Sequence, residues 1–289
     1  SSDLYQQTAK INWHEIFSPI KTFKVDVHLA TRGKDHPSSN EVSRDIRLAI
    51  QDQFLRSTNK VPKVELKDPE IIICAYYSAK KVTLSINTAR TSLHKRGYRL
   101  PGHPAPLKET MAAALLHLAS YEGKQVFLDP MCGSGTIAIE AAYLALNKAP
   151  LIHRKKNEFG FEHLIDFNRS LWRSIQEKVR EEKLALAPHQ IYAADMDQTY
   201  VELAKKTALR ARVEKHIQFS TSSFFDLLPP APTGIIVTNL PYGKRLGQEK
   251  ELKEFYQNIG DHLKKNYSNW QACLFVDQDS PWKFIGLKP

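Results

Sequence analysis

From Thr110 onward, short apolar stretches alternate with longer segments in which apolar residues recur every three or four positions. Short apolar stretches bounded by turn residues are typical of buried strands, and the longer repeat is typical of helices. We predict strands at 124–130, 190–195, 216–221, 234–239 and 270–276, and helices at 111–120, 135–146, 166–186, 249–264 and through Leu203 and Leu209. Strands that alternate with helices form a parallel sheet covered on both faces, so this part of the chain is predicted to be α/β.

The chain before residue 96 has a different texture. Residues 23–29 alternate apolar and polar side chains, which is typical of a half-buried strand. Residues 38–56 show the helical repeat, and residues 70–79 and 81–89 predict a hairpin of two strands. Together these elements predict a small α/β unit at the front of the chain.

A linker separates the two regions in the sequence. Residues 96–109 contain three prolines and two glycines, which disfavour regular structure. We therefore predict a first domain at residues 1–95, a linker at 96–107 and a second domain at 108–289.

Part of the net charge of +10 is concentrated in one stretch of the sequence. No acidic residue occurs between Glu70 and Glu109. The basic residues in that stretch are Lys80, Lys81, Arg90, Lys95, Arg96, Arg99 and Lys108. A segment with one sign of charge attracts polyanions, among which nucleic acid is the commonest. The alternative is a solvated basic face without a partner.

Several classes of protein are disfavoured by the composition. No apolar run approaches the roughly 18 residues that a membrane span requires, and the sequence does not open with a basic and then apolar leader. The cysteines Cys74, Cys132 and Cys273 form no C-x-x-C pair, so neither a disulfide scaffold nor a metal site is indicated. We expect a cytoplasmic protein without a bound metal.

The stretch DPMCGSGT, residues 129–136, lies where a predicted strand gives way to a helix. Glycines let the backbone approach a ligand closely, and a helix N-terminus offers free N–H groups. The loop has no lysine, which disfavours a nucleoside triphosphate, and Asp129 would repel a pyrophosphate but accept a cation. S-adenosylmethionine carries an ammonium and a sulfonium, so we predict that it binds here, with Gly133 and Gly135 making room for its amino-acid part. The candidate residues of the loop are Asp129, Pro130, Cys132, Gly133, Gly135 and Thr136. A tight strand-to-helix turn without a ligand is the alternative.

One strand later, the stretch AADMD places Asp195 at the end of the neighbouring strand. A carboxylate at that position can accept both ribose hydroxyls of a nucleoside, as ligands of such sheets bind at the carboxyl ends of the strands. Aspartate at the start of a helix is also a common cap, which is the alternative interpretation of this residue.

The stretch TNLPYG, residues 238–243, follows another apolar strand. The side-chain oxygen of Asn239 and the carbonyl of Leu240 can each accept one hydrogen of an amine on a flat ring. Pro241 would stiffen the loop, and Tyr242 would stack on the ring, an interaction worth roughly 1–3 kcal/mol. We predict a clamp for a base whose amine receives a methyl group, with catalysis mainly by positioning. A simple turn is the alternative.

These motifs resemble a known family. LDPMCGSGTIAIEAA followed by TNLPYGKRL is similar to the S-adenosylmethionine-dependent amino-methyltransferases of the N-P-P-Y type. LHKRGYRLPGHPAPLKETMAAALL and DLYQQTAKINWHEIFSPIKTFKVDV resemble the THUMP-domain guanine-N2 RNA methyltransferases, in particular bacterial enzymes that act on large-subunit ribosomal RNA.

The resemblance implies a THUMP RNA-binding domain followed by a Rossmann-like class I methyltransferase domain. It implies methylation of the exocyclic N2 amine of a guanine in 23S ribosomal RNA, with transfer RNA as the alternative substrate. The RNA contacts would then involve Lys80, Lys81, Lys95, Arg96, Arg99 and Lys108. It also implies a further segment before Ser1 and further strands after Pro289.

The chain departs from the family pattern at two site positions. Leu240 stands where the clamp usually has a second proline. Ser223 aligns with an aspartate that receives the adenine amine, a role that either the Ser223 hydroxyl or Asp226 would have to fill.

Four other functions fit parts of the sequence less well. An adenine-N6 DNA methyltransferase uses the same clamp, but the sequence has no helix-turn-helix or zinc finger to read a duplex. Methylation of a protein glutamine is disfavoured because that activity would not explain the basic stretch. A pyrimidine-C5 methyltransferase needs a nucleophilic cysteine in the target loop, and the loop has none. A non-catalytic RNA-binding or assembly factor with a degenerate site is favoured only by the departures at Leu240 and Ser223.

Overall fold

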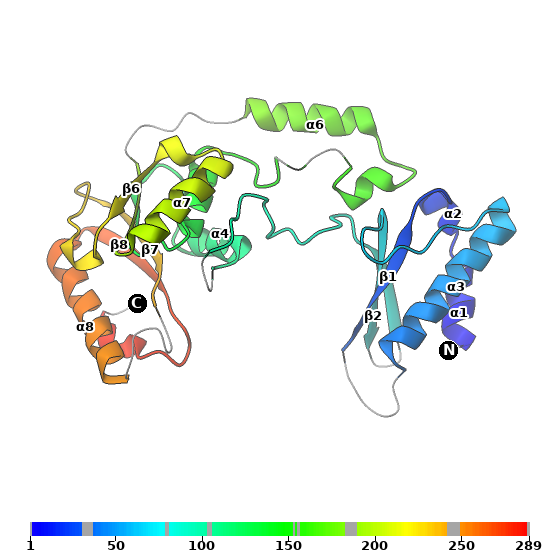
Figure 1. The fold of residues 1–289 in the computed structure, drawn as a ribbon, viewed down its shortest axis with the longest axis horizontal. Coiled ribbons are helices and arrows are strands. Elements are labelled where there is room, and N and C mark those ends of the chain that lie inside the picture. The colour runs from blue at the N-terminus through cyan, green and yellow to red at the C-terminus, as the bar shows by residue number, and fades with distance from the viewer. Residues whose placement is uncertain are drawn as a thin grey trace. The chain divides into compact units, whose positions relative to one another are not determined.

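The computed structural model describes residues 2–30, 37–78, 81–102, 106–152, 154, 157–182, 190–241 and 249–287. The chain divides into two compact units (Figure 1). Unit 1 consists of Ser1–Ser92 and Arg154–Ile175, and unit 2 consists of Leu93–His153 and Gln176–Pro289. The predicted limits of 1–95, 96–107 and 108–289 did not anticipate that a second stretch of chain belongs to unit 1.

Unit 1 is built on a three-stranded sheet. Its elements are α1 (Ser2–Ala9), α2 (Trp13–Ile16), β1 (Phe23–Leu29), α3 (Ser39–Thr58), β2 (Ile71–Ser78), β3 (Lys81–Ile86) and the 3-10 turn η1 (Gly160–His163). The order is β1-β2-β3, with β1 parallel to β2 and β2 antiparallel to β3, which confirms the predicted hairpin. Helix α3 starts at a capping box in which Ser38 and Glu41 satisfy each other's backbone N–H groups. The core between sheet and helices includes Phe17, Phe23, Ile46 and Phe54.

The second stretch of unit 1 is fastened to the first by backbone and side-chain contacts. Leu164 forms a β-bridge with Phe17, and the buried His163 lies 3.3 Å from the Lys21 ammonium. A Cβ added at Gly160 would collide with the backbone carbonyl of Asn87, so a glycine is required for this close approach. Residues far apart in the sequence therefore complete one core.

Unit 2 contains the predicted parallel sheet. Its elements are α4 (Glu109–Leu118), β4 (Phe127–Asp129), α5 (Thr136–Ala145), β5 (Ile191–Asp195), α7 (Gln198–Arg210), η2 (Glu214–His216), β6 (Ile217–Thr221), η3 (Phe224–Asp226), β7 (Gly234–Asn239), α8 (Glu249–Asn266), β8 (Trp270–Phe275) and η5 (Trp282–Ile285), while α6 (Arg169–Glu181) crosses the boundary between the units. The strands are all parallel, in the order β6-β5-β4-β7-β8. This is the Rossmann-like α/β arrangement that the sequence predicts.

Both faces of this sheet are covered because its strands are apolar on both sides. Phe127 and Ile235 belong to a core cluster with residues of α4, α5 and α7. Their neighbours Leu128 and Ile236 belong to a second cluster, together with Tyr256 of α8. Alternate residues of a strand point to opposite faces, so each short strand contributes to both clusters.

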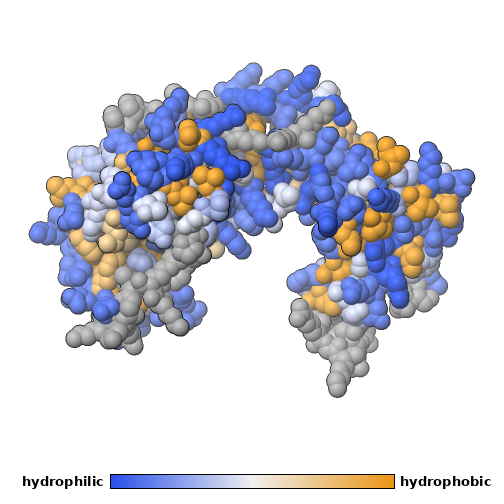
Figure 2. Space-filling view, viewed as in Figure 1, coloured by the Kyte–Doolittle hydropathy of each residue, from blue (hydrophilic) through white to orange (hydrophobic). Residues whose placement is uncertain are grey.

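One face of the molecule can be described by the hydropathy of its residues. Figure 2 shows mostly hydrophilic residues on the viewed face, with smaller apolar areas between them. Within the described ranges, no helix is both long and apolar enough to cross a membrane.

Candidate functional site

The three polar residues singled out by the motifs end three neighbouring strands. Asp129, Asp195 and Asn239 are the last residues of β4, β5 and β7, which are adjacent in the sheet. Strands β5 and β6 lie on one side of β4 in the sheet, and β7 and β8 lie on the other side, so the strand order reverses at β4. Such a reversal opens a crevice at the carboxyl ends of the strands, where ligands of open α/β sheets bind.

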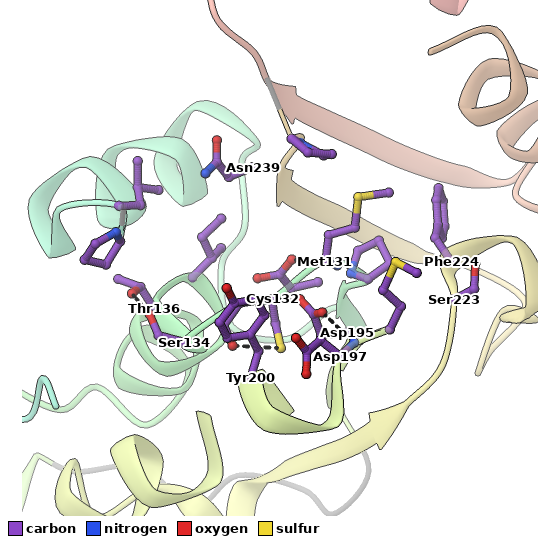
Figure 3. A pocket seen from close by; sticks show the side chains of 18 of the residues that line it. Met131, Cys132, Ser134, Thr136, Asp195, Asp197, Tyr200, Ser223, Phe224 and Asn239 are labelled. Atoms are coloured by element: carbon purple, nitrogen blue, oxygen red, sulfur yellow. Dashed lines mark hydrogen bonds between the residues drawn. The ribbon is translucent and has the colours of Figure 1, made fainter. Parts of the chain in front are cut away.

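A cavity of about 1020 Å³ lies at this crevice (Figure 3). The predicted site residues that line it are Asp129, Pro130, Cys132, Gly133, Thr136, Asp195, Ser223, Asn239 and Pro241. Motifs that lie far apart along the chain therefore meet at one cavity. Gly135, Asp226 and Leu240 are not among the residues that line it.

Asp129 is buried, with 1% of its surface exposed, and its two oxygens differ. Oδ1 accepts a hydrogen bond of 2.8 Å from the Thr238 hydroxyl and a longer one from the Met131 N–H. Oδ2 has no partner among the described residues. Burial raises the pKa of Asp129 from 3.8 to about 7, although the two hydrogen bonds act in the opposite direction. A cation that enters the cavity would find an unpaired carboxylate oxygen.

The loop after β4 is held by the neighbouring strand β5. The Cys132 N–H donates to the Ala194 carbonyl at 2.8 Å, and the Gly133 N–H donates to Asp195 Oδ2 at 2.9 Å. Gly135 has φ of 79°, and a Cβ there would lie 3.0 Å from the Ala204 side chain of α7. This glycine thus serves the turn and the packing of α5 on α7. Burial raises the pKa of the Cys132 thiol well above its usual value, so this cysteine stays protonated.

The Asp195 carboxylate holds the neighbouring loop and can still accept further hydrogen bonds. Its Oδ1 accepts the Asp197 N–H at 3.0 Å and its Oδ2 accepts the Gly133 N–H. A carboxylate has about four lone-pair positions, so each oxygen can still accept one more hydrogen bond from a ligand hydroxyl.

The clamp loop begins at the end of β7. Asn239 Oδ1 is buried and has no partner among the described residues. The Leu240 side chain is fully buried in the cluster on the α8 face, and its N–H donates to the Phe275 carbonyl at 3.0 Å. A proline at position 240 would lack this hydrogen bond. The Tyr256 hydroxyl donates to the Pro241 carbonyl at 3.3 Å and so secures the loop from α8. Tyr242 lies outside the described residues.

Ser223 and Asp226 occupy the two ends of a 3-10 turn. The Ser223 side chain caps this turn by accepting the Phe225 N–H at 3.3 Å, and Ser223 lines the cavity. Asp226 is exposed. Of the two candidates for the adenine amine, Ser223 is the one at the cavity.

The basic residues predicted to contact RNA fall into two groups. Lys81, Lys95 and Lys108 are exposed. Arg96 and Arg99 are engaged in ion pairs with buried glutamates, and only 9% of the Arg96 side chain is exposed. Burial makes Arg96 unsuited to the RNA contact that its charge suggested. Lys80 lies outside the described residues.

Sequence reasoning missed much of the cavity wall. The further lining residues are Pro106, Leu107, Met131, Ser134, Ile137, Met196, Asp197, Gln198, Tyr200, Phe224, Phe225 and Phe255. Met196 and Phe224 directly follow the predicted site residues Asp195 and Ser223, so their position in the sequence could have indicated them. Phe255 lies on α8, far from any motif, and nothing in the sequence pointed to it. Within the described part of the chain, no three His, Cys, Asp or Glu residues are grouped as metal ligands.

Two family models match the chain. Residues 2–87 match the THUMP domain, and residues 96–289 match the RMKL-like methyltransferase domain. These matches confirm the resemblance to the THUMP-domain methyltransferases that the motifs indicated.

Individual relatives agree with this result. The chain is 36% identical to a Synechocystis protein named as a candidate RNA methyltransferase, over 100% of the chain and 74% of that protein. It is 34% identical to the ribosomal RNA large subunit methyltransferase K/L of Shewanella frigidimarina, over 95% of the chain and 38% of that enzyme. The solved structure of SMU.472, a candidate methyltransferase complexed with SAH (S-adenosylhomocysteine), superposes with a TM-score of 0.88 at 26% identity and covers 99% of this chain and 74% of its own. The chain therefore belongs to the family of RMKL-like methyltransferases that carry a THUMP domain.

Proposed function

We propose that the chain transfers a methyl group from S-adenosylmethionine to the exocyclic N2 amine of a guanine in RNA, with 23S ribosomal RNA as the favoured substrate. The observation that carries this proposal is a pair of buried oxygens, Asp129 Oδ2 and Asn239 Oδ1, that have no hydrogen-bond partner within the part of the chain that the structure describes. They belong to residues at the ends of two adjacent strands, and both residues line one cavity. Buried polar atoms are normally hydrogen-bonded, so two orphans in one cavity favour ligands that would satisfy them.

The Asp129 side of the cavity suits the methyl donor. The volume of about 1020 Å³ lies at the upper end of the range of roughly 300–1,000 Å³ for small-molecule sites, which favours two ligand groups in one space. Asp129 Oδ2 would accept a hydrogen bond from the ammonium, and Asp195 would accept the ribose hydroxyls. When bound, S-adenosylmethionine supplies a methyl group on a sulfonium, which is already a good leaving group.

The Asn239 side suits the base. Asn239 Oδ1 would accept one hydrogen of the amine and so hold its nitrogen in place. The Leu240 carbonyl, the second acceptor that the motif suggests, belongs to a fully buried residue that does not line the cavity, so the proposal does not depend on it. The Tyr256–Pro241 hydrogen bond stiffens this loop before the base arrives. The contribution of these residues is positioning rather than proton transfer, and well-oriented reactants lower a barrier substantially.

The substrate assignment is supported by the relatives and by charge. The Synechocystis and Shewanella relatives are named for RNA and ribosomal RNA, and the exposed lysines Lys81, Lys95 and Lys108 would attract a phosphate backbone. Because the chain spans only 38% of the Shewanella enzyme, the ribosomal substrate is taken from a much longer protein. Transfer RNA is the alternative substrate.

The proposal is tested by methyl transfer from tritiated S-adenosylmethionine to undermodified ribosomal RNA and, separately, to transfer RNA, followed by nucleoside analysis. We expect N2-methylguanosine in ribosomal RNA. N6-methyladenosine as the product would overturn the assignment of guanine as the target base. Label in transfer RNA alone would show that transfer RNA, and not ribosomal RNA, is the substrate. RNA binding without any transfer would favour a non-catalytic RNA-binding factor, in line with the departures at Leu240 and Ser223. The protein with any flanking segments of its natural chain should be used.

A further inference from the structure

Two arginines of the predicted linker have their charges engaged inside unit 2. Arg96 lies 3.4 Å from Glu140 of α5, whose other oxygen accepts a hydrogen bond of 2.8 Å from the Tyr98 hydroxyl. Arg99 donates through Nε to Glu109 at the start of α4, at 3.0 Å. The side chains of Glu140 and Glu109 are 2% and 3% exposed. A cation beside a buried carboxyl favours its ionised form, so both arginines act as counter-ions within the unit.

Arg99 makes a second contact with a different consequence. Its Nη2 donates to the backbone carbonyl of Leu107, while Nε remains on Glu109. The planar guanidinium thereby joins the chain just before α4 to the first residue of that helix. A lysine has one point of charge on a flexible stem and cannot reproduce such a fork.

The residues held by Arg99 are part of the functional cavity. Leu107 and its neighbour Pro106 line the same cavity as Asp129 and Asn239. Leu107 also packs against the core cluster formed by α4, α5 and α7. The Leu107 side chain thus packs on the apolar core, and the Leu107 carbonyl accepts a hydrogen bond from Arg99. Together these two contacts fix this part of the cavity wall.

We propose that Arg99 is a positioning residue of the methyl-transfer site, because its guanidinium fixes the wall formed by Pro106 and Leu107. This inference rests on the proposed function, since the wall matters only if the cavity binds the methyl donor. Its action is through geometry and not through attraction of RNA, which separates Arg99 from the exposed lysines of the basic stretch.

The test compares Arg99→Lys with Arg210→Lys, a matched change at an exposed arginine of α7. Binding of SAH is measured by calorimetry, RNA affinity is measured across a salt series, and kcat and KM are measured for S-adenosylmethionine. For Arg99→Lys we expect SAH affinity to fall about tenfold, the order of one missing charge-assisted hydrogen bond. KM for the donor should rise more than kcat falls, and the salt dependence of RNA binding should be unchanged because the charge is retained. Arg210→Lys should change none of these.

A second variant guards against a folding defect in the first. Pro106→Gly loosens the wall directly and leaves both buried ion pairs in place, and we expect it to weaken SAH binding as well. Wild-type SAH affinity in both Arg99→Lys and Pro106→Gly would overturn the inference and leave the proposed function intact. A changed RNA salt dependence with unchanged SAH affinity in Arg99→Lys would also overturn it. Absence of SAH binding by the wild-type chain would overturn the proposed function and this inference together.

Discussion

The Thr238 hydroxyl donates a hydrogen bond of 2.8 Å to Asp129 Oδ1 and so ties the end of β7 to the end of β4. Asp129 therefore has one oxygen held in place and one oxygen without a partner among the described residues. Because Asn239 directly follows Thr238, this contact adds to the pairing of β4 with β7 in setting the spacing between the residue assigned to the methyl donor and the residue assigned to the base.

The affinity for SAH should depend on pH through Asp129. The pKa of this carboxyl is about 7 without a ligand, and an ammonium bound beside it would favour the ionised form. Binding below pH 7 therefore releases a proton, and affinity should rise by up to about tenfold per pH unit until it levels above pH 7. Calorimetry at several pH values on either side of that pKa would measure this rise. Asp129→Asn should bind more weakly with a flat profile, and an identical slope in both proteins would contradict the assignment.

Asp129 should also make the stability of the ligand-free protein depend on pH. Its pKa is higher in the folded state, about 7, than the ordinary value of 3.8. The folded state therefore holds a proton that the unfolded state has released, so the contribution of Asp129 is fully present below pH 3.8 and is lost as pH rises through about 7. Urea unfolding should show wild type losing roughly 1.4 kcal/mol per pH unit relative to Asp129→Asn between these limits. Parallel pH profiles of the two proteins would refute this.

Replacement of Asn239 should separate turnover from donor binding. Asn239→Ala removes an oxygen assigned to the amine of the base and leaves Asp129 and Asp195 in place. We expect kcat to fall by about 100-fold or more, the order found for removal of one group that orients a reacting centre, with SAH affinity unchanged. Single-turnover assays and calorimetry measure the two quantities. If SAH affinity falls as much as it does in Asp129→Ala, the two residues do not have separate roles.

Gly160 tests whether residues 154–175 belong to unit 1. In Gly160→Ala the new methyl group would collide with the Asn87 carbonyl, which should lower the free energy of unfolding by roughly 1–3 kcal/mol. SAH binding, which we assign to unit 2, should persist at temperatures where the variant remains folded. The matched variant is Gly260→Ala on α8, where an added Cβ would collide with the Ile285 carbonyl. It should weaken SAH binding, and the opposite pattern would contradict the division into units.

Charge neutralisation should distinguish exposed from buried basic residues. Lys95→Gln should weaken RNA binding and make the salt dependence shallower by about one released counterion, because one cation no longer neutralises a phosphate. Arg96→Gln should instead lower the melting temperature, because it leaves Glu140 buried without its cation. Filter binding in a salt series and thermal unfolding measure the two effects. An RNA salt slope that is the same in wild type and Lys95→Gln would remove that lysine from the RNA surface.

The sequence was informative where chemistry and local pattern coincide. Asp129, Asp195 and Asn239 each end an apolar stretch, and the carboxyl ends of parallel strands meet on one side of the sheet, where ligands bind. The apolar stretches predict β4, β5 and β7, and this rule predicts that the DPMCGSGT loop lies at the ligand-binding side.

The sequence was uninformative where the outcome depends on a distant partner. Arg96 and Arg99 stand in a run of basic residues, and only the fold brings the buried Glu140 and Glu109 beside them. Phe255 reaches the cavity because α8 covers one face of the sheet, which no periodicity within α8 reveals. Position 160 needs a glycine because of the Asn87 carbonyl, which belongs to a much earlier part of the chain.

The division of unit 1 into two stretches affects the order in which the protein can be completed during synthesis. Residues 1–92 leave the ribosome first, but Phe17 and Asn87 meet their partners only after Leu164 and Gly160 have been made. Domains generally fold as units during synthesis, beginning with the most N-terminal one. Unit 1 can be completed only after the first strand and helices of unit 2 have been synthesised. A chimera that transplants only residues 1–92 would carry an unfinished domain, so any graft of this unit must include both stretches.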